Sequence, residues 1–209
     1  MLETYILALT TFFATIGPID VAVVFAGLTS NKSAATKKKL ATKGVLIAAG
    51  LLLLFALLGE GLLSSLGITL AALRTAGGIL LLLIGIDMVF ARVSGGTSTT
   101  PDEAEEAEKS QDISVFPLAT PLIAGPGAIG AVILLMANVE GDVALQSMVI
   151  AGLLSILTGT FIALLGASQV HKLLGVTGLH VITRIFGVIL CALAVQFMFD
   201  GIKQSGMFS

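Results

Sequence analysis

Two Gly-Pro pairs, each near the middle of a long apolar run, are the residues with the most specific chemistry in this sequence. They are Gly17-Pro18 and Gly125-Pro126, and Pro121 stands about one turn before the second pair. Proline has no N–H and its ring clashes with the preceding turn, so each pair should break a helix and free backbone carbonyls. In an apolar surrounding such groups are tolerated only inside protein or beside a water-filled cavity. One break could be a simple kink, but two at the same depth favour a site for a small polar solute.

Asp20 follows the first break closely and carries a charge at membrane depth. A bare carboxylate there costs ~2.5–3.5 kcal/mol on insertion scales, so it needs a partner or a proton. With Gly17 as N-cap and Pro18 as the first helical residue, Asp20 would favour the dipole of the following helix. It could equally bind a proton or Na⁺, or face the ammonium group of a substrate. The two roles are compatible, and the sequence leaves both open.

The second break has Ala128 where the first has Asp20. The N–H groups of Gly127, Ala128 and Ile129 are therefore expected to lack a negative partner and to suit a carboxylate. A zwitterion would satisfy both breaks. The residues predicted to bind substrate or ion are Thr15, Gly17, Pro18, Asp20, Pro121, Gly125, Pro126, Gly127 and Ala128.

The elements that must position these residues are membrane-spanning helices. Hydrophobic residues make up 56% of the chain and charged residues only 11%, against about a quarter charged in an ordinary globular chain. Each apolar run is close to the ~20 residues that cross a bilayer as a helix. The sequence therefore predicts an all-α membrane protein with six transmembrane helices, over residues 5–28, 44–66, 69–90, 113–137, 144–168 and 179–199.

Charge sets the expected orientation. The connection between the first two spans holds five lysines, which the positive-inside rule assigns to the cytoplasm: Lys32, Lys37, Lys38, Lys39 and Lys43. Both termini are then expected outside. Residues 93–112 contain an acidic run and are expected to form a flexible cytoplasmic linker. His171 and His180 are expected to flank an exposed connection before the sixth span.

The chain on either side of that linker reads as a repeat. Ile16-Gly17-Pro18 corresponds to Ala124-Gly125-Pro126, and Arg74-x-x-Gly77 corresponds to Arg184-x-x-Gly187. Each half, residues 1–92 and 113–209, contains three spans, so the second half must enter the membrane from the opposite side. The prediction is two inverted three-helix repeats, the first helix of each broken at mid-membrane, which is the commonest plan of secondary transporters.

Several other functions have no support in the sequence. The net charge is −2 and the bases form no stripe that suits nucleic acid. No group of His, Cys and Asp has metal-ligand spacing, and there is no nucleotide-binding loop or Ser/His/Asp set at depth. Cys191 is expected to be a small core residue, and Arg74 and Arg184 to be structural. We therefore predict no enzyme, metal or cofactor, with the lipid bilayer as a partner, and a homo-oligomer left open.

The segment from Pro121 to Ile129 resembles the P-L-x-x-G-P-G-A-I signature of the MarC family of inner-membrane proteins. The resemblance extends over the whole chain and includes the F-x-x-L-T pattern that starts at Phe25. It departs at the first break, where the family pattern is N-P-x-G-x-x-P-x-F. Here Gly17 replaces the Asn, Asp20 replaces the Gly and Val23 replaces the second Pro.

The resemblance implies a secondary transporter of small neutral amino acids such as glycine or alanine, located in the inner membrane. Transport would be driven by an H⁺ or Na⁺ gradient. The two breaks in repeat-related helices predict that it works by alternating access, with one repeat rocking against the other. The resemblance extends to the motif residues of the second half, and to Pro18 and Phe25 of the first half. It does not extend to Gly17 and Asp20. The alternatives are a transporter or channel for another small polar solute, and a membrane subunit that does not transport.

Overall fold

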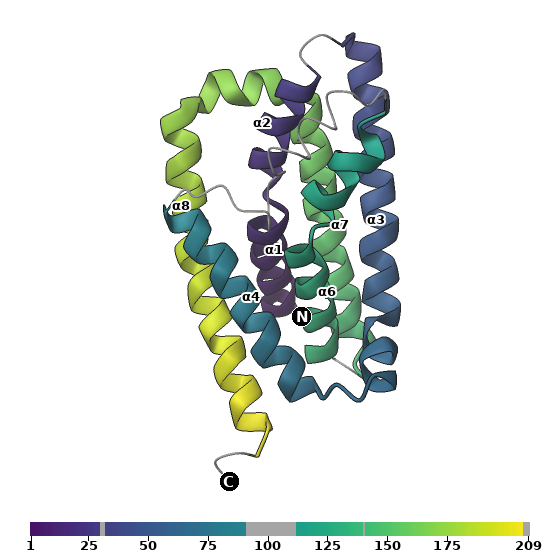
Figure 1. Cartoon of the computed structure of the whole chain (residues 1–209), viewed down its shortest axis with the longest axis vertical. Helices are drawn as coiled ribbons and strands as arrows, with labels where there is room; N and C mark the ends of the chain where they lie inside the picture. Colours follow the sequence, from purple (N-terminus) through teal and green to yellow (C-terminus); the bar gives the residue numbers. More distant parts are fainter. Residues whose placement is uncertain (30–31, 91–111, 140, 207–209) are drawn as a thin grey trace.

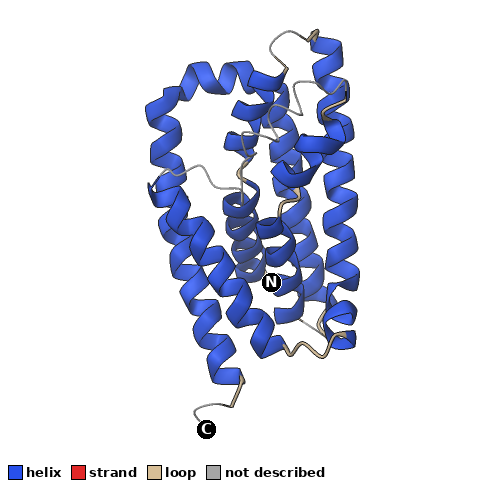
Figure 2. Cartoon of the chain, in the orientation of Figure 1, coloured by secondary structure: helices blue, strands red, loops and turns tan. Residues whose placement is uncertain are grey.

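The structure is a bundle of helices. The computed structural model describes residues 1–29, 32–90, 112–139 and 141–206, and every element assigned in these ranges is helical (Figure 2). In chain order they are α1 (Leu2–Ile16), α2 (Pro18–Leu28), α3 (Ala34–Ser65), α4 (Leu70–Phe90), η1 (Ser114–Ile123), α6 (Pro126–Asn138), α7 (Val143–Leu165) and α8 (Ala167–Gln204). The predicted all-α class is confirmed.

Five helical segments of the described chain are long and apolar enough to cross a bilayer, namely Leu2–Leu28, Ala34–Gly59, Leu70–Phe90, Val143–Leu165 and Thr183–Gln204. The pair formed by η1 and α6 passes the same test together, although it is bent by 54° at the break between them. Counted as one span, this pair makes six. The chain is therefore an integral, multi-pass membrane protein, with spans close to the predicted positions.

Two helices extend beyond the predicted spans. Helix α3 begins at Ala34 and not near Gly44, with the N–H of Thr36 donating to Ser33 Oγ at 3.3 Å. Helix α8 begins at Ala167, so the predicted connection between the fifth and sixth spans is itself helical, while the apolar spans on either side are Val143–Leu165 and Thr183–Gln204. Hydropathy detects the membrane-embedded part of a helix, whereas the helix itself continues through Lys, Gln and His, which tolerate helical backbone. The predicted linker, apart from Asp112, lies outside the described residues.

The two broken segments form the centre of the bundle. α1 and α2 pack against α7 and α8, and η1 packs against α3, while α6 packs against both α3 and α4 (Figure 1). The apolar window of Leu2–Leu28 is 56% buried, against 28% for that of Thr183–Gln204. The helices α3, α4, α7 and α8 therefore enclose the breaks.

Helices α4 and α8 run side by side at one edge of the molecule (Figure 1). Glycines let their backbones approach: a Cβ added at Gly85 would lie 2.6 Å from Cys191 Sγ and 3.0 Å from the carbonyl oxygen of Gly187. Such small-residue crossings are typical of membrane helices. Near the ends of both helices, Arg74 Nη1 donates to Gln204 Oε1 at 2.6 Å, which agrees with a structural role for this arginine.

Candidate functional site

The first break consists of a single residue between two helices. Gly17 has φ 60° and ψ 61°, and its N–H donates to the Phe13 carbonyl at 3.0 Å, which closes α1. Its own carbonyl accepts from the N–H of Val21 at 2.9 Å, which opens α2. Gly17 is thus the C-cap of one helix and, as predicted, the N-cap of the next, with Pro18 at the start of α2. This left-handed backbone favours glycine because other residues have a Cβ that clashes there.

Asp20 lies in the first turn of α2, as predicted, and is exposed. It lines a small hollow of about 10 Å³ together with Gly17 and residues from α1, α2, α4 and α8, namely Phe13, Ile19, Met88 and Thr183. This volume is close to the lower limit for one water molecule. A carboxylate and a hydroxyl beside a break in the backbone supply oxygen ligands of the kind that a hard cation prefers. The arrangement can therefore hold a proton or a small cation, but has no room for an organic solute.

The sequence did not point to Phe13, Met88 and Thr183 as site residues. Two of them come from helices far along the chain, and only the packing of α4 and α8 brings them to the first break. The one available signal was the hydroxyl of Thr183 within an apolar run.

Thr15 was predicted to bind substrate or ion, but the structure places its side chain away from the hollow. Its side chain is buried, and its hydroxyl donates to the Thr11 carbonyl at 2.9 Å, so it serves its own helix and does not line the hollow. Thr11 is fully buried, and its hydroxyl has no hydrogen-bond partner among the described residues. An unsatisfied buried hydroxyl costs about 1–3 kcal/mol, so Thr11 is a polar position within α1 that lowers stability.

The second break is longer and more irregular. In η1 the residues Phe116 and Thr120 are extended, and each precedes a cis-proline, at Pro117 and Pro121. The segment ends where the N–H of Ala124 donates to the Ala119 carbonyl at 2.8 Å. The predicted interruption is therefore present, but it affects the whole half-helix before Gly125 because prolines remove two backbone donors there.

Helix α6 starts with Gly125 as N-cap and Pro126 in its first turn, directly after the predicted break. The N–H of Ile129 donates to the Gly125 carbonyl at 3.0 Å, so the prediction that this group is free was wrong. Ile129 is the first residue that can reach the N-cap carbonyl, as in any helix. Gly127 and Ala128 precede it, in the turn whose N–H groups have no partner within the helix.

One turn of α4 lies against both breaks. Met88 lines the hollow at the first break, and a Cβ added at Gly127 would overlap the Ile84 side chain. Ile84 and Met88 are four residues apart, so they share a face of α4 and are separated by about 6 Å along its axis. Gly125, Gly127 and Ala128 are buried, Pro121 is partly buried and Pro126 is exposed. None of these five residues lines the hollow, so the two halves of the predicted site are neighbouring but separate.

A charged contact fixes the start of η1 to the basic end of α3. Lys43 Nζ lies 2.5 Å from Asp112 Oδ2, and Asp112 Oδ1 accepts from the N–H of Ser114 at 3.1 Å and from its hydroxyl at 2.5 Å. The bonds from Lys43 and Ser114 hold the pKa of the Asp112 carboxyl well below its usual range. This end of the second broken segment is therefore anchored to the first half of the chain.

Comparison with known proteins gives one consistent result. The profile of a family described as "MarC family integral membrane protein" matches residues 2–206. A UPF0056 membrane protein of Methanocaldococcus jannaschii is 40% identical, with 97% of each chain covered. The UPF0056 membrane proteins YvbG of Bacillus subtilis and YhcE of Escherichia coli are 35% and 33% identical, covering 94% and 91% of this chain and 92% and 88% of their own. No solved structure matches the chain.

Proposed function

Because the chain belongs to the MarC family of integral membrane proteins, we propose that it is a secondary transporter, and not an enzyme, that carries a small neutral amino acid such as glycine or alanine with H⁺ or Na⁺. The observation that carries the proposal is the pair of helix breaks in the middle of the bundle, both in contact with the same turn of α4. Discontinuous helices at this position are typical of substrate and ion sites in secondary transporters. Neither break has a purpose in a protein that only supports a partner.

The two breaks suit opposite ends of a zwitterion or an ion pair. At the first, Asp20 provides negative charge in a hollow that Thr183 also lines. At the second, the start of α6 provides the positive end of a helix dipole and the N–H groups of Gly127 and Ala128, with no acidic residue in that turn. We therefore assign the cation, or the amino group of the substrate, to the first break and the carboxylate to the second.

Two inverted repeats would account for this arrangement. Gly152 follows Gly44 by the same number of residues as Gly125 follows Gly17. A Cβ at Gly44 of α3 would lie 2.5 Å from Leu118 of η1, and a Cβ at Gly152 of α7 would lie 2.9 Å from Ala8 of α1. Helices α3 and α7 are the second helices of the two proposed halves. Each thus contacts the broken segment of the other half at an equivalent glycine, as two-fold symmetry between the halves requires.

Other helix pairs follow the same exchange. α2 packs against α7 and α8. Its proposed counterpart, α6, packs against α3 and α4, which are the proposed counterparts of α7 and α8. The second motif pair is less symmetric, because Gly77 meets Leu134 of α6 whereas Gly187 meets Met88 of α4. The proposed halves are therefore related in architecture but differ in detail at the third helices.

The size of the hollow supports alternating access. A volume of about 10 Å³ admits an ion or a water molecule but no amino acid. A substrate of the size of an amino acid would enter this hollow only if the helices around it moved, and the rocking of one repeat against the other is the common way in which such folds open. In the proposed orientation the lysine-rich start of α3 faces the cytoplasm of a cell whose inner membrane holds the protein, and both termini lie outside.

Flux through purified protein tests this proposal. Proteoliposomes loaded with buffer should accumulate labelled glycine or alanine above the external concentration when an inward H⁺ or Na⁺ gradient is imposed, and should stop when an ionophore removes the gradient. Equilibration without accumulation would indicate a channel. No uptake of either amino acid under any gradient would contradict the proposal.

A further inference from the structure

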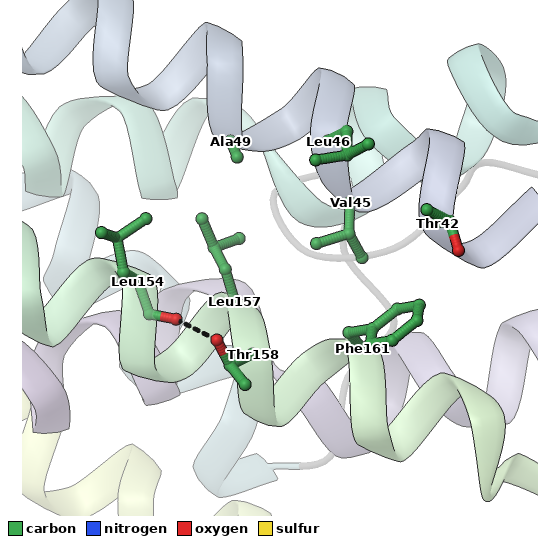
Figure 3. A pocket seen from close by; sticks show the side chains of 8 residues that line it. All are labelled: Thr42, Val45, Leu46, Ala49, Leu154, Leu157, Thr158 and Phe161. Carbon is green, nitrogen blue, oxygen red and sulfur yellow. Dashed lines mark hydrogen bonds between the residues drawn. The ribbon is translucent and has the colours of Figure 1, made fainter.

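An apolar groove runs between α3 and α7, apart from both helix breaks. It has a volume of about 280 Å³ and is lined by residues of these two helices alone, namely Thr42, Val45, Leu46, Ala49, Leu154, Leu157, Thr158 and Phe161 (Figure 3). Leu46 and Leu154 at its edges are 66% and 44% exposed, whereas Leu157 at its floor is buried. The groove is therefore open along the outer surface of the bundle.

The groove offers no hydrogen bonds to an occupant. Its two hydroxyl groups donate to their own helices, Thr158 to the Leu154 carbonyl at 2.8 Å, as drawn in Figure 3, and Thr42 to the Lys38 carbonyl at 2.9 Å. All other lining side chains are hydrocarbon. A polar occupant would lose its hydrogen bonds here, so the occupant must itself present hydrocarbon.

Two lysines stand at one end of this groove. Lys38 lies one helical turn before Thr42 and seven residues before Val45, and Lys39 lies seven residues before Leu46. Residues four and seven apart share a helix face, so both lysines continue the groove toward the start of α3. Both are exposed, and no described residue forms an ion pair with either, whereas Lys43 is neutralised by Asp112.

We propose that this groove binds one anionic phospholipid, with an acyl chain along α3 and α7 and the phosphate headgroup at Lys38 and Lys39. The complementarity is that of an amphiphile: hydrocarbon where the groove is apolar, and negative charge where the bases begin. Basic clusters beside membrane helices attract anionic headgroups. A second copy of this chain would bring its own pair of lysines to the same end and repel the first.

The dimensions agree with a lipid tail. From Thr42 to Ala49 the groove follows seven residues of α3, or about 10 Å at the rise of a helix. This is roughly two-thirds of one leaflet of a ~30 Å hydrocarbon core. An acyl chain whose headgroup sits at the lysines would thus lie in the groove for most of its depth in that leaflet.

The test is lipid retention by the purified full-length protein in neutral detergent, measured by native mass spectrometry. Phosphatidylglycerol and phosphatidylcholine with the same acyl chains are added in turn. We expect one phosphatidylglycerol per chain to be retained, and phosphatidylcholine to be retained much less. The double variant Lys38→Gln/Lys39→Gln should weaken retention by about tenfold or more, and Ala49→Phe, which fills the groove, should abolish it.

The matched control is Lys32→Gln/Lys37→Gln, which removes the same charge away from the groove and should retain the lipid. If Ala49→Phe fails to fold, Val45→Phe gives the same readout. Equal loss in the control variant would indicate diffuse attraction and overturn the proposal, as would equal retention of both lipids. A dimer that forms without bound lipid and is lost in Ala49→Phe would assign the groove to a second copy instead. None of these outcomes depends on whether the protein transports amino acids.

Discussion

Gly17 is required at the first break for two separate reasons. Its backbone is left-handed, and a Cβ at this position would lie 3.3 Å from Asp20 Oδ2. The same glycine thus allows the chain to turn and allows the carboxylate to lie close to the break. Any larger residue must disturb either the turn or the position of Asp20.

Replacing Gly17 by Ala should lower stability by about 1–2 kcal/mol, the cost of a left-handed backbone for an L-residue. Gly27→Ala in α2 is the matched control, since a Cβ there has nothing within 4 Å and alanine favours a helix by up to about 1 kcal/mol. Thermal unfolding of both variants in the same detergent measures the difference. Equal unfolding temperatures for the two variants would show that Gly17 is not constrained as described.

At the scale of elements, the anchoring of η1 to α3 depends on one carboxylate. Asp112 accepts bonds from Lys43 and Ser114, and these bonds are stronger when its carboxyl group is charged. Because its pKa is lowered in the folded protein, the charged form contributes stability at pH values above the ordinary pKa of an aspartate, about 4. That contribution is lost as the pH falls below this value toward the folded-state pKa.

We expect the wild-type protein to be more stable than Asp112→Asn at pH 7, by no more than about 1 kcal/mol, because Lys43 and Asp112 are both about half exposed. The difference should shrink in 1 M salt and as the pH falls below about 4. Unfolding temperatures from pH 3 to 8 provide the measurement. In a Lys43→Gln background the same substitution should matter less, and an unchanged effect there would contradict the role given to the ion pair.

The positions of the helices could be predicted from the sequence where hydropathy determines them, but not where prolines and helix caps do. The spans were found because ~20 apolar residues have few alternatives to crossing a bilayer. The start of α3 and the helix through residues 169–178 were missed because polar helical residues carry no hydropathy signal. The irregular path of η1 had a signal in Pro117 and Pro121, four residues apart, which cannot both belong to a regular α-helix without loss of two hydrogen bonds.

For the molecule as a whole, the number of crossings depends on the bent pair of η1 and α6. If the pair crosses the membrane there are six spans, and the two ends of the described chain lie on the same side. If it enters and returns, there are five, and the ends lie on opposite sides. The proposed inverted repeat requires the first arrangement.

Single cysteines in a Cys191→Ala background distinguish these topologies. Glu3→Cys and Ser205→Cys, both at exposed positions, should react with a membrane-impermeant thiol reagent in intact cells, whereas Ser33→Cys should react only after lysis. Lys32→Cys serves as a second reporter for the lysine-rich side. Labelling of only one of the two end positions in intact cells would contradict six crossings.

The site was only partly predictable at this scale. The cap at Gly17, the position of Asp20 in its helix and the break at Gly125 follow from local rules, and the structure has them as predicted. The contributions of Met88, Thr183 and Ile84 depend on how α4 and α8 pack across the two halves, which no local pattern specifies. The contact of Ile84 with the first turn of α6 likewise depends on packing between helices and could not be predicted from the sequence.

In the proposed function, Asp20 at the first break couples an ion to transport. The most direct test of this coupling is the pH dependence of gradient-driven uptake of labelled glycine or alanine by proteoliposomes that contain either wild-type protein or Asp20→Asn. We predict that wild-type uptake changes with pH and that Asp20→Asn loses this dependence along with most accumulation, while it remains folded by size-exclusion chromatography. An unchanged pH profile and undiminished accumulation in Asp20→Asn would reduce Asp20 to a helix cap and contradict the account.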